Sequence, residues 1–209
     1  MSDMTIESYK HRIEDGGANA PLFFTFHGTG GDEHQFPDLA RDLMPSATIV
    51  SPRGDVSEGG ALRFFRRTAE GVYDMEDLAV RTERMAGFIE AIVAERRPRA
   101  VVGLGYSNGA NILASVIFAR PDLFDGAVLM HPLIPFQPQV EGSLSGKSIL
   151  ITAGRKDPIC PPNLTNRLES YLQGLDAGVE TVWHDGAHEV RPVEIEAARQ
   201  FLRKWEIDR

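Results

Sequence analysis

The sequence predicts an α/β fold: one domain, residues 1–209, with a mainly parallel β-sheet and helices on both of its faces. Short apolar runs, each bounded by Gly, Pro or polar residues, have the length and character of buried parallel strands. Segments with apolar residues at helical spacing alternate with these runs, which is the order of β-α-β units. A chain of 209 residues is long enough for one sizeable domain and short for two.

The expected elements follow one another along the chain. A first segment at 9–13 is expected to add an antiparallel edge strand, and buried strands are predicted at 22–26, 48–50, 100–104, 127–130, 148–152 and 179–183. Helices are predicted at 74–96, 110–118, 164–172 and 193–205. The first of these helices ends before Pro98, which cannot continue a helix. The intervals between the later strands leave no room for a large cap domain.

The segment 52–71 interrupts the alternation of strands and helices. It is long, rich in glycine, and surrounds the run Leu62-Arg-Phe-Phe-Arg-Arg67. Long ordered loops in compact domains often carry function. Two interpretations stay open. Either Arg63, Phe64 and Phe65 contact the substrate, as acyl pocket or as a guide for an anionic group, or the aromatic rings anchor the loop while the arginines stay solvated.

Composition excludes several classes of function. The contents of 42% hydrophobic and 25% charged residues are those of an ordinary soluble protein. A formal net charge of −8 argues against nucleic-acid binding. The single cysteine, Cys160, allows no intrachain disulfide. Residues 1–8 lack the pattern of a secretory signal, and no apolar run approaches the ~18 residues of a membrane span. The sequence therefore indicates a cytoplasmic protein without a membrane partner, and it is compatible with a homodimer.

The strongest motif is Gly105-Tyr-Ser-Asn-Gly109, a match to G-x-S-x-G. An apolar β-branched run leads into it and a helix-compatible run leads out, which is the strand–turn–helix setting of a nucleophile elbow. Such a turn strains the backbone of the serine, and the flanking glycines relieve crowding between strand and helix. The alternative is a tight turn in which Ser107 merely caps the helix.

A serine nucleophile needs a base and an orienting carboxylate, and in α/β-hydrolases these follow in the chain order Ser, acid, His. Asp157 is the candidate acid, because it lies in the turn that follows the predicted strand at 148–152. The alternative is that Asp157 is a turn residue or a cap near Pro158.

His188 is the preferred base, because it lies beyond the strand at 179–183 and after the flexible Gly186-Ala187. His184 is the second choice, since it continues directly from the strand, and His131 precedes Asp157 and so has the wrong order. Two histidines four residues apart also occur in metal sites. Gly186 between them and the lack of a clear third ligand argue against that reading, so no metal is expected.

Acyl transfer also needs hydrogen-bond donors for the developing oxyanion. The strand at 22–26 runs into the glycine-rich turn His27-Gly-Thr-Gly-Gly31, which is related to the H-G-G-G type of loop. The backbone N–H of Thr29, or of a neighbour, is one candidate donor, and that of Asn108 is the other. A phosphate-binding P-loop is excluded, because the Gly-Lys-Ser/Thr ending is absent.

Jointly these motifs resemble the carboxylesterase/phospholipase branch of the α/β-hydrolase superfamily, which includes the acyl-protein thioesterases. The matching segments, between about residues 22 and 190, are His27-Gly-Thr-Gly-Gly-Asp32, Ser51-Pro-Arg-Gly54, Gly105-Tyr-Ser-Asn-Gly109, the Asp157 turn and the loop ending in His188. The resemblance implies a catalytic triad of Ser107, Asp157 and His188, and an oxyanion hole of Thr29 and Asn108. It further implies an acyl-enzyme, hydrolysis of small-molecule carboxylic esters or thioesters, and no cofactor.

The chain departs from its relatives at a few positions. Typical acyl-protein thioesterases carry Leu and Gln where this chain has Thr29 and Asn108, and the run 62–67 is more like that of bacterial esterases. These differences argue against lipidated-protein substrates. Dienelactone hydrolases resemble the chain in architecture but use Cys as nucleophile, where this chain has Ser107.

Two other functions compete with hydrolysis. The run Gly103-Leu-Gly-Tyr-Ser-Asn-Gly109 has some likeness to a dinucleotide-binding fingerprint, but its glycine spacing is irregular and the next strand leads to His131 rather than to an acidic residue. A hydrolase-like binding protein without activity is the other alternative. Every residue type that hydrolysis needs is present, so the sequence favours the enzyme.

Overall fold

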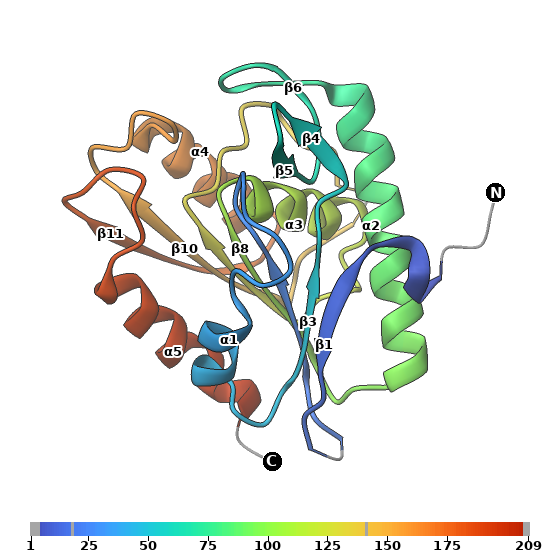
Figure 1. The fold of residues 1–209 in the computed structure, drawn as a ribbon. Coiled ribbons are helices and arrows are strands. Elements are labelled where there is room, and N and C mark those ends of the chain that lie inside the picture. The colour runs from blue at the N-terminus through green and yellow to red at the C-terminus, as the bar shows by residue number, and fades with distance from the viewer. Residues whose placement is uncertain (1–4, 18, 141, 207–209) are drawn as a thin grey trace.

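A seven-stranded sheet forms the centre of the computed structural model, which describes residues 5–17, 19–140 and 142–206 (Figure 1). Its strands lie in the order β1-β3-β2-β8-β9-β10-β11. Their bounds are β1 His11–Glu14, β2 Leu22–Phe26, β3 Thr48–Pro52, β8 Val101–Tyr106, β9 Gly126–Met130, β10 Ser148–Gly154 and β11 Gly178–His184. The edge strand β1 pairs antiparallel with β3, and the other pairings are parallel.

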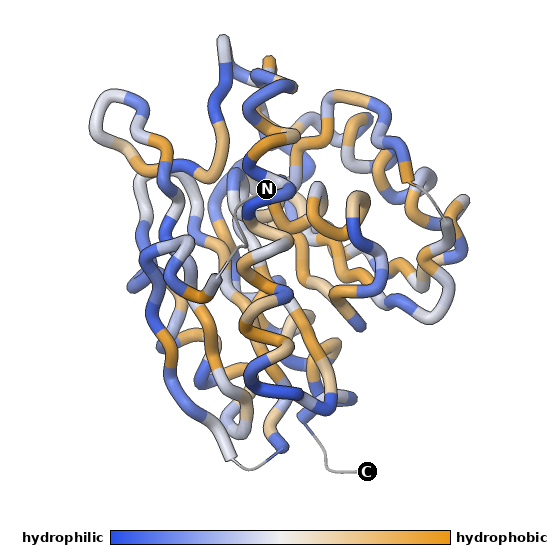
Figure 2. The backbone as a smooth tube through the Cα atoms, turned by 90° about the vertical axis from the view of Figure 1, so that its right-hand side faces the viewer, coloured by the Kyte–Doolittle hydropathy of each residue, from blue (hydrophilic) through white to orange (hydrophobic). Residues whose placement is uncertain are grey.

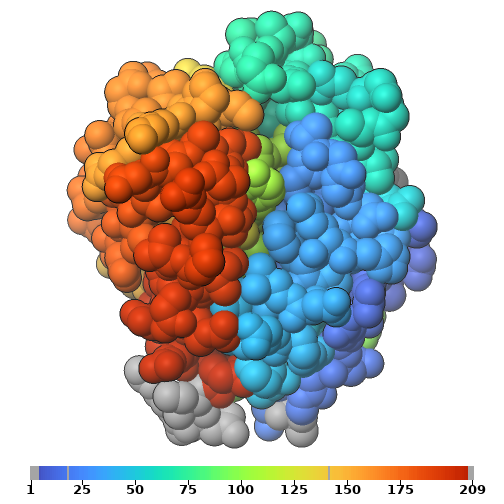
Figure 3. Space-filling view, turned by 60° about the vertical axis from the view of Figure 1, so that its left-hand side comes forward, coloured from blue at the N-terminus to red at the C-terminus, as the bar shows by residue number. Residues whose placement is uncertain are grey.

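Helices cover both faces of the sheet. They are α1 Pro37–Leu43, α2 Met75–Arg96, α3 Asn108–Ala119, α4 Pro162–Gln173 and α5 Pro192–Glu206. Buried side chains of α2, α3 and α4 pack into one apolar core, whereas those of α1 and α5 pack into a second core on the opposite face. The helices α1 and α5 lie side by side on that face (Figure 3). Hydrophobic segments concentrate toward the interior (Figure 2).

The long helix α2 shows how the sequence sets the bounds of an element. Asp74 caps its start by accepting a hydrogen bond of 3.1 Å from the N–H of Asp77. The apolar side chains that face the sheet are buried, among them Met85 and Phe88, whereas Met75 at the start of the helix is exposed. The helix ends at Arg96, and its C-cap Arg97, just before Pro98, has a left-handed φ of 48°. None of the described helices is long and apolar enough to cross a membrane.

The predicted α/β class is confirmed, and each predicted strand and helix is present, although several extend by one to three residues beyond the predicted bounds. The antiparallel edge strand is also present, as β1. Residues 1–4, part of the segment that was tested for a secretory signal, lie outside the described residues. Between β9 and β10 the chain forms a loop without helix or strand in its described part, so no cap domain is inserted there.

Three kinds of element were not predicted. One is the single-turn 3-10 helix η1, Ile6–Ser8, which precedes β1. The short helix α1 begins at Pro37, a favoured first helical residue, but its seven residues give little periodicity. The segment 52–71, read as a loop, contains the short strands β4 Val56–Glu58, β5 Ala61–Arg63 and β6 Arg67–Ala69. β4 pairs with β5, and β6 pairs with β7 Val72–Tyr73, which directly follows the segment. Strands of two or three residues are too short for an alternating pattern to be recognised.

Candidate active site

Ser107 occupies a strained turn between β8 and α3. Its φ of 53° and ψ of −116° lie outside the regions that residues with a side chain normally adopt. The turn is held by the Ser107 N–H, which donates to the carbonyl of Met130 at 2.9 Å on the neighbouring strand β9. The Ser107 side chain makes no cap hydrogen bond to the helix. The structure thus has the geometry of a nucleophile elbow, and the alternative role of Ser107 as a helix cap does not hold.

The two glycines of the motif are required by the close approach of backbone segments. A Cβ on Gly105 would lie 2.5 Å from the carbonyl oxygen of Gly109. A Cβ on Gly109 would lie 2.5 Å from the carbonyl oxygen of His27, and closer still to that of Phe26. Strand β2, strand β8 and helix α3 can therefore meet at this point only where neither residue has a side chain.

Three predicted residues form one hydrogen-bonded chain. His188 Nε2 lies 2.9 Å from Ser107 Oγ, and His188 Nδ1 lies 2.7 Å from Asp157 Oδ2. Each residue follows a different strand. The three meet because the carboxyl ends of the parallel strands β8, β10 and β11 lie at one edge of the sheet. The His188 side chain remains 18% exposed, whereas that of Asp157 is fully buried.

The buried carboxylate of Asp157 is held by four donors. Oδ1 accepts hydrogen bonds from the N–H groups of Ile159 at 2.8 Å and Cys160 at 2.9 Å. Oδ2 is bound by Nδ1 of His188 and, at 2.8 Å, by Nδ1 of His131. Burial alone would raise the pKa of Asp157, but the hydrogen bonds from the two imidazoles and from Cys160 outweigh it and hold the pKa well below its usual range. Asp157 is therefore an ionised carboxylate.

His184, the second candidate base, does not contact Ser107. Its Nδ1 accepts the N–H of Gly186 at 3.0 Å, and its Nε2 lies 2.7 Å from Glu194 Oε1. Since Nδ1 is an acceptor, the neutral ring carries its proton on Nε2, which faces a carboxylate. Of the two candidates, the structure places only His188 beside Ser107.

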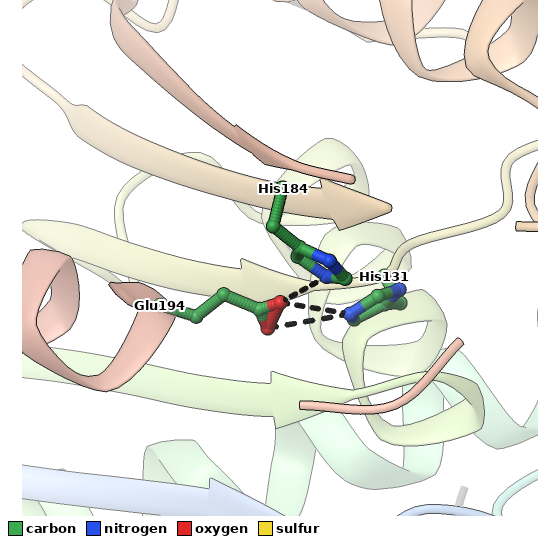
Figure 4. Close-up of side chains that lie close together, drawn as sticks. All are labelled: His131, His184 and Glu194. Carbon is green, nitrogen blue, oxygen red and sulfur yellow. Dashed lines mark hydrogen bonds and ion pairs between the residues drawn. The ribbon is translucent and has the colours of Figure 1, made fainter. Parts of the chain in front are cut away.

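His131, His184 and Glu194 form a second group of polar side chains, which the sequence did not predict as a group (Figure 4). His131 connects this group to Asp157. His131, excluded above as the base because of its position in the chain, is fully buried, and its Nε2 lies 3.0 Å from Oε1 of Glu194. Glu194 is also fully buried and belongs to the first turn of α5. His131 directly follows β9, at the edge of the sheet that also carries Ser107 and Asp157, and that position was the one available clue. Glu194 carried no such clue in the sequence, because an acidic residue in the first turn of a helix is usually explained by its favourable interaction with the helix dipole.

The two carboxylates determine the charge of His131. Burial by itself lowers the pKa of the ring, but the hydrogen bonds to Asp157 and Glu194 outweigh this effect and raise the pKa to about 9. His131 is thus an imidazolium at neutral pH, with a proton on each nitrogen and a carboxylate facing each proton.

Two clusters place three metal-binding side chains close together: His131, His184 and Glu194, and His131, Asp157 and His188. In the first, the proton on Nε2 of His184 occupies the nitrogen that would have to bind the ion. In the second, Asp157 Oδ2 lies 2.8 Å and 2.7 Å from two ring nitrogens, whereas two ligands of a tetrahedral zinc would be about 3.3 Å apart. Both clusters fit a hydrogen-bond network better than a metal site.

The glycine-rich loop after β2 carries Thr29, which lines a cavity at Ser107. It is fixed by hydrogen bonds from the N–H of Gly30 to the carbonyl of Leu62, at 2.9 Å, and from Arg63 Nη1 to Thr29 Oγ1, also at 2.9 Å. Asn108 begins α3, where the first N–H groups lack an acceptor within the helix. The N–H groups of Thr29 and Asn108 remain the candidate oxyanion donors.

A cavity of about 270 Å³ opens at Ser107. It is lined by Thr29, Arg63, Arg67, Glu70, Gly71, Tyr73, Tyr106, Ser107, Asn108, Asn111, Leu133, Ile159, Cys160 and His188. Phe64 and Phe65 do not line it, which corrects their predicted role as substrate contacts. Both rings are fully buried, Phe64 against His27 and Phe65 against Tyr73, so they anchor the loop. Arg63 does line the cavity, but it is buried rather than solvated.

A mainly parallel sheet with helices on both faces, and a serine elbow whose histidine and acid follow later strands, define an α/β-hydrolase. The chain belongs to the dienelactone hydrolase family, whose sequence profile matches residues 67–189. The family is one of hydrolases.

Three relatives illustrate the comparison. The chain is 39% identical to the Bacillus subtilis protein MhqD, named as a hydrolase, over 93% of this chain and 98% of that one. It is 56% identical, with a TM-score of 0.93, to Atu2452 of Agrobacterium tumefaciens, a protein of unknown function; the match covers 97% of this chain and 99% of that one. It is 38% identical to a Bacillus cereus carboxylesterase, with a TM-score of 0.89 and 94% of each chain covered.

These comparisons confirm the resemblance to α/β-hydrolases of the carboxylesterase group that the motifs indicated. They also change the relation of the chain to the dienelactone hydrolases. Ser107, in place of a cysteine nucleophile, distinguishes the chain from dienelactone hydrolases as expected from the sequence, yet this difference does not take it out of that family.

The contacts at Gly109 predict that the Gly109→Ala variant is destabilised. The new methyl group would overlap the backbone of β2, so the free energy of unfolding should fall by about 3 kcal/mol, at the upper end of overpacking effects. Gly17→Ala is the matched control, since a Cβ at Gly17 meets nothing within 4 Å; it should change stability by about 1 kcal/mol or less. Urea unfolding measures both, and equal effects would contradict the crowding argument.

The charge of His131 predicts a loss of stability at alkaline pH. Because folding raises the pKa of the ring from 6.5 to about 9, the stabilisation is complete below pH 6.5 and disappears as the pH rises through 9. The free energy of unfolding should fall by about 1–3 kcal/mol over that interval. Urea unfolding at several pH values tests this, with His131→Asn as the control that lacks the titrating ring. Parallel pH curves for the two proteins would show that His131 is not the source.

Proposed function

We propose that the protein is a serine hydrolase that cleaves carboxylic esters through an acyl-enzyme. Ser107 is the nucleophile, His188 the general base, and Asp157 the carboxylate that orients His188. The observation that carries this proposal is the continuous contact from Ser107 Oγ through the His188 ring to Asp157, with distances of 2.9 Å and 2.7 Å. The carboxylesterase from Bacillus cereus and the hydrolase relative MhqD support the same class of reaction.

The geometry gives each step an assigned group. Asp157 binds the Nδ1–H of His188, which leaves the lone pair on Nε2 to take the proton from Ser107 as its oxygen attacks the ester carbonyl. The N–H groups of Thr29 and Asn108 stabilise the oxyanion that forms. His188 then gives its proton to the departing alcohol. Water, activated by the same ring, hydrolyses the acyl-enzyme and releases Ser107. The same steps apply to thioesters.

The sequence features that suggested other functions have an explanation within the fold. The glycine run 103–109 forms the elbow, with Gly105 and Gly109 explained by contacts within the fold rather than by a nucleotide. A binding protein without activity would have no need for a strained serine in contact with a histidine that is itself held by a buried carboxylate.

The cavity favours small substrates. Its volume of about 270 Å³ and its many polar and charged walls suit a short acyl group, and Leu133 and Ile159 are the apolar side chains of the lining. Because Phe64 and Phe65 lie in the core, we assign the apolar contact with the substrate to Leu133 and Ile159. Arg63, which lines the cavity and binds Thr29, supports the glycine-rich loop.

The Ser107→Ala variant should lose nearly all esterase activity. Loss of the nucleophile lowers kcat on the order of 10⁶-fold in a well-studied serine protease. Ser115→Ala, on the same segment of chain and outside the cavity lining, is the control and should keep its activity. A fluorophosphonate probe should label the wild type and the control but not Ser107→Ala. Labelling of Ser107→Ala at the wild-type rate would identify another nucleophile.

The size of the cavity predicts a preference for short acyl chains. Hydrolysis of p-nitrophenyl acetate and butyrate should have a higher kcat/KM than hydrolysis of the palmitate ester, because 270 Å³ is too small for a long chain. Steady-state rates across a series of chain lengths, with an acetyl and a palmitoyl thioester beside them, measure this. A preference for palmitoyl groups would refute the proposed substrate size and would favour a lipid substrate.

A further inference from the structure

Oδ2 of Asp157 serves two imidazole rings, and the hydrolytic mechanism explains only one of them. His188 binds this oxygen at 2.7 Å and His131 binds it at 2.8 Å. A second ring on the same oxygen competes for the charge that orients the base. The structure therefore contains a feature, fully buried and adjacent to the proposed triad, to which the mechanism gives no role.

The surroundings of His131 come from five separate parts of the fold. The ionisable groups that face its ring are Asp157, Glu194, His184, His188 and Tyr106. Its backbone carbonyl accepts a contact of 3.2 Å from the thiol of Cys160. Among these groups Asp157 and Glu194 are the two anions, and each faces a different nitrogen of the ring. The ring is thus an imidazolium between two carboxylates, consistent with its pKa of about 9.

The sum of the charges gives Glu194 its role. Asp157, His131 and Glu194 together carry one net negative charge, the same as the lone carboxylate of an ordinary triad. If Glu194 were neutral, the positive charge of His131 would cancel that of Asp157, and the His188 imidazolium that forms during catalysis would lose its stabilising partner. The effect is large here because all three side chains are buried, where charges interact strongly.

We propose that Glu194 is a positioning residue of the hydrolytic site, which acts through His131 to keep the negative charge of Asp157 available to His188. This inference rests on the proposed function. Glu194 touches neither Ser107 nor the cavity lining; its contacts are with His131, His184 and, at 3.4 Å, the hydroxyl of Thr152.

The Glu194→Gln variant removes the charge and keeps the shorter hydrogen bond to His131. A glutamine oxygen in the place of Oε1 can accept from Nε2 of His131, 3.0 Å away, and lie beside Nε2 of His184. The amide nitrogen takes the place of Oε2, which lies 3.3 Å from His131 Nε2 and 3.4 Å from the Thr152 hydroxyl. At pH 6.5, where the ring of His131 is still protonated in the variant, we expect kcat for p-nitrophenyl acetate to fall about tenfold to a hundredfold with KM unchanged, the range seen for outer-shell partners of metal ligands. Glu196→Gln, an exposed position on the same helix, should match the wild type.

The state of the ring provides a readout independent of activity. In ¹⁵N-labelled wild-type protein, both ring nitrogens of His131 should carry protons from pH 6.5 to about pH 8.5. In Glu194→Gln the ring should lose a proton within that range, because one of its two anionic partners is neutral. Below this transition the positive ring cancels the charge of Asp157 and kcat stays low; above it the ring is neutral and kcat should recover. An unchanged titration in the variant would overturn the proposal.

A double-mutant cycle separates positioning from a general effect on the fold. Asparagine is the suitable replacement for His131, since the residue has a φ of 50°, a conformation that Asn tolerates. If Glu194 acts through His131, Glu194→Gln should change kcat less than about twofold once His131 is asparagine. Equal losses in both backgrounds would overturn the proposal. Failure of the fluorophosphonate probe to label the wild type would instead overturn the proposed function itself, whereas normal labelling with wild-type kcat in Glu194→Gln would overturn this inference alone.

Discussion

The buried carboxylate of Asp157 is the constraint on which the site depends. An ionised side chain that is buried away from water must be paired and hydrogen-bonded; otherwise its pKa shifts and the side chain becomes neutral. Here two backbone N–H groups fix Oδ1 and two imidazoles fix Oδ2. The direction of His188, and through it the contact with Ser107, follows from this arrangement. The second imidazole introduces a positive charge into the interior, and the carboxylate of Glu194 on the far side of that ring compensates it.

The parallel sheet makes this convergence possible. Strands β8, β9, β10 and β11 are neighbours, and the residues just beyond their carboxyl ends are Ser107, His131, Asp157 and His188. The elbow adds a local requirement, because β2 and α3 approach so closely that Gly105 and Gly109 cannot carry a Cβ. The contact between β2 and the elbow also positions the Thr29 loop, which starts where β2 ends. A single edge of the sheet therefore aligns both the hydrogen-bonded chain and the candidate oxyanion donors.

Sequence reasoning succeeded where a property is local. The strands are continuous apolar runs, the elbow is a five-residue motif, and the contact of His188 with Ser107 is the one that chain order and the loop position led us to expect. It failed where a role depends on distant partners. Phe64 and Phe65 read equally well as pocket or anchor, and only their packing against His27 and Tyr73 decides between the two. Glu194 has no distinguishing pattern of its own, because its role requires His131, which is 63 residues away in the chain.

Three histidines lie around two carboxylates, and the partners of their nitrogens give each a different form. His188 faces Asp157 with Nδ1, so a neutral ring donates from there and has its lone pair on Nε2, 2.9 Å from Ser107 Oγ. His184 accepts at Nδ1 from the N–H of Gly186, so the proton of a neutral ring is on Nε2, which lies 2.7 Å from Oε1 of Glu194. His131 has an anion at each nitrogen and keeps both protons. Residue type alone would make all three candidates for the base. The hydrogen-bond partner of the second nitrogen decides, and it leaves a free lone pair beside the serine on His188.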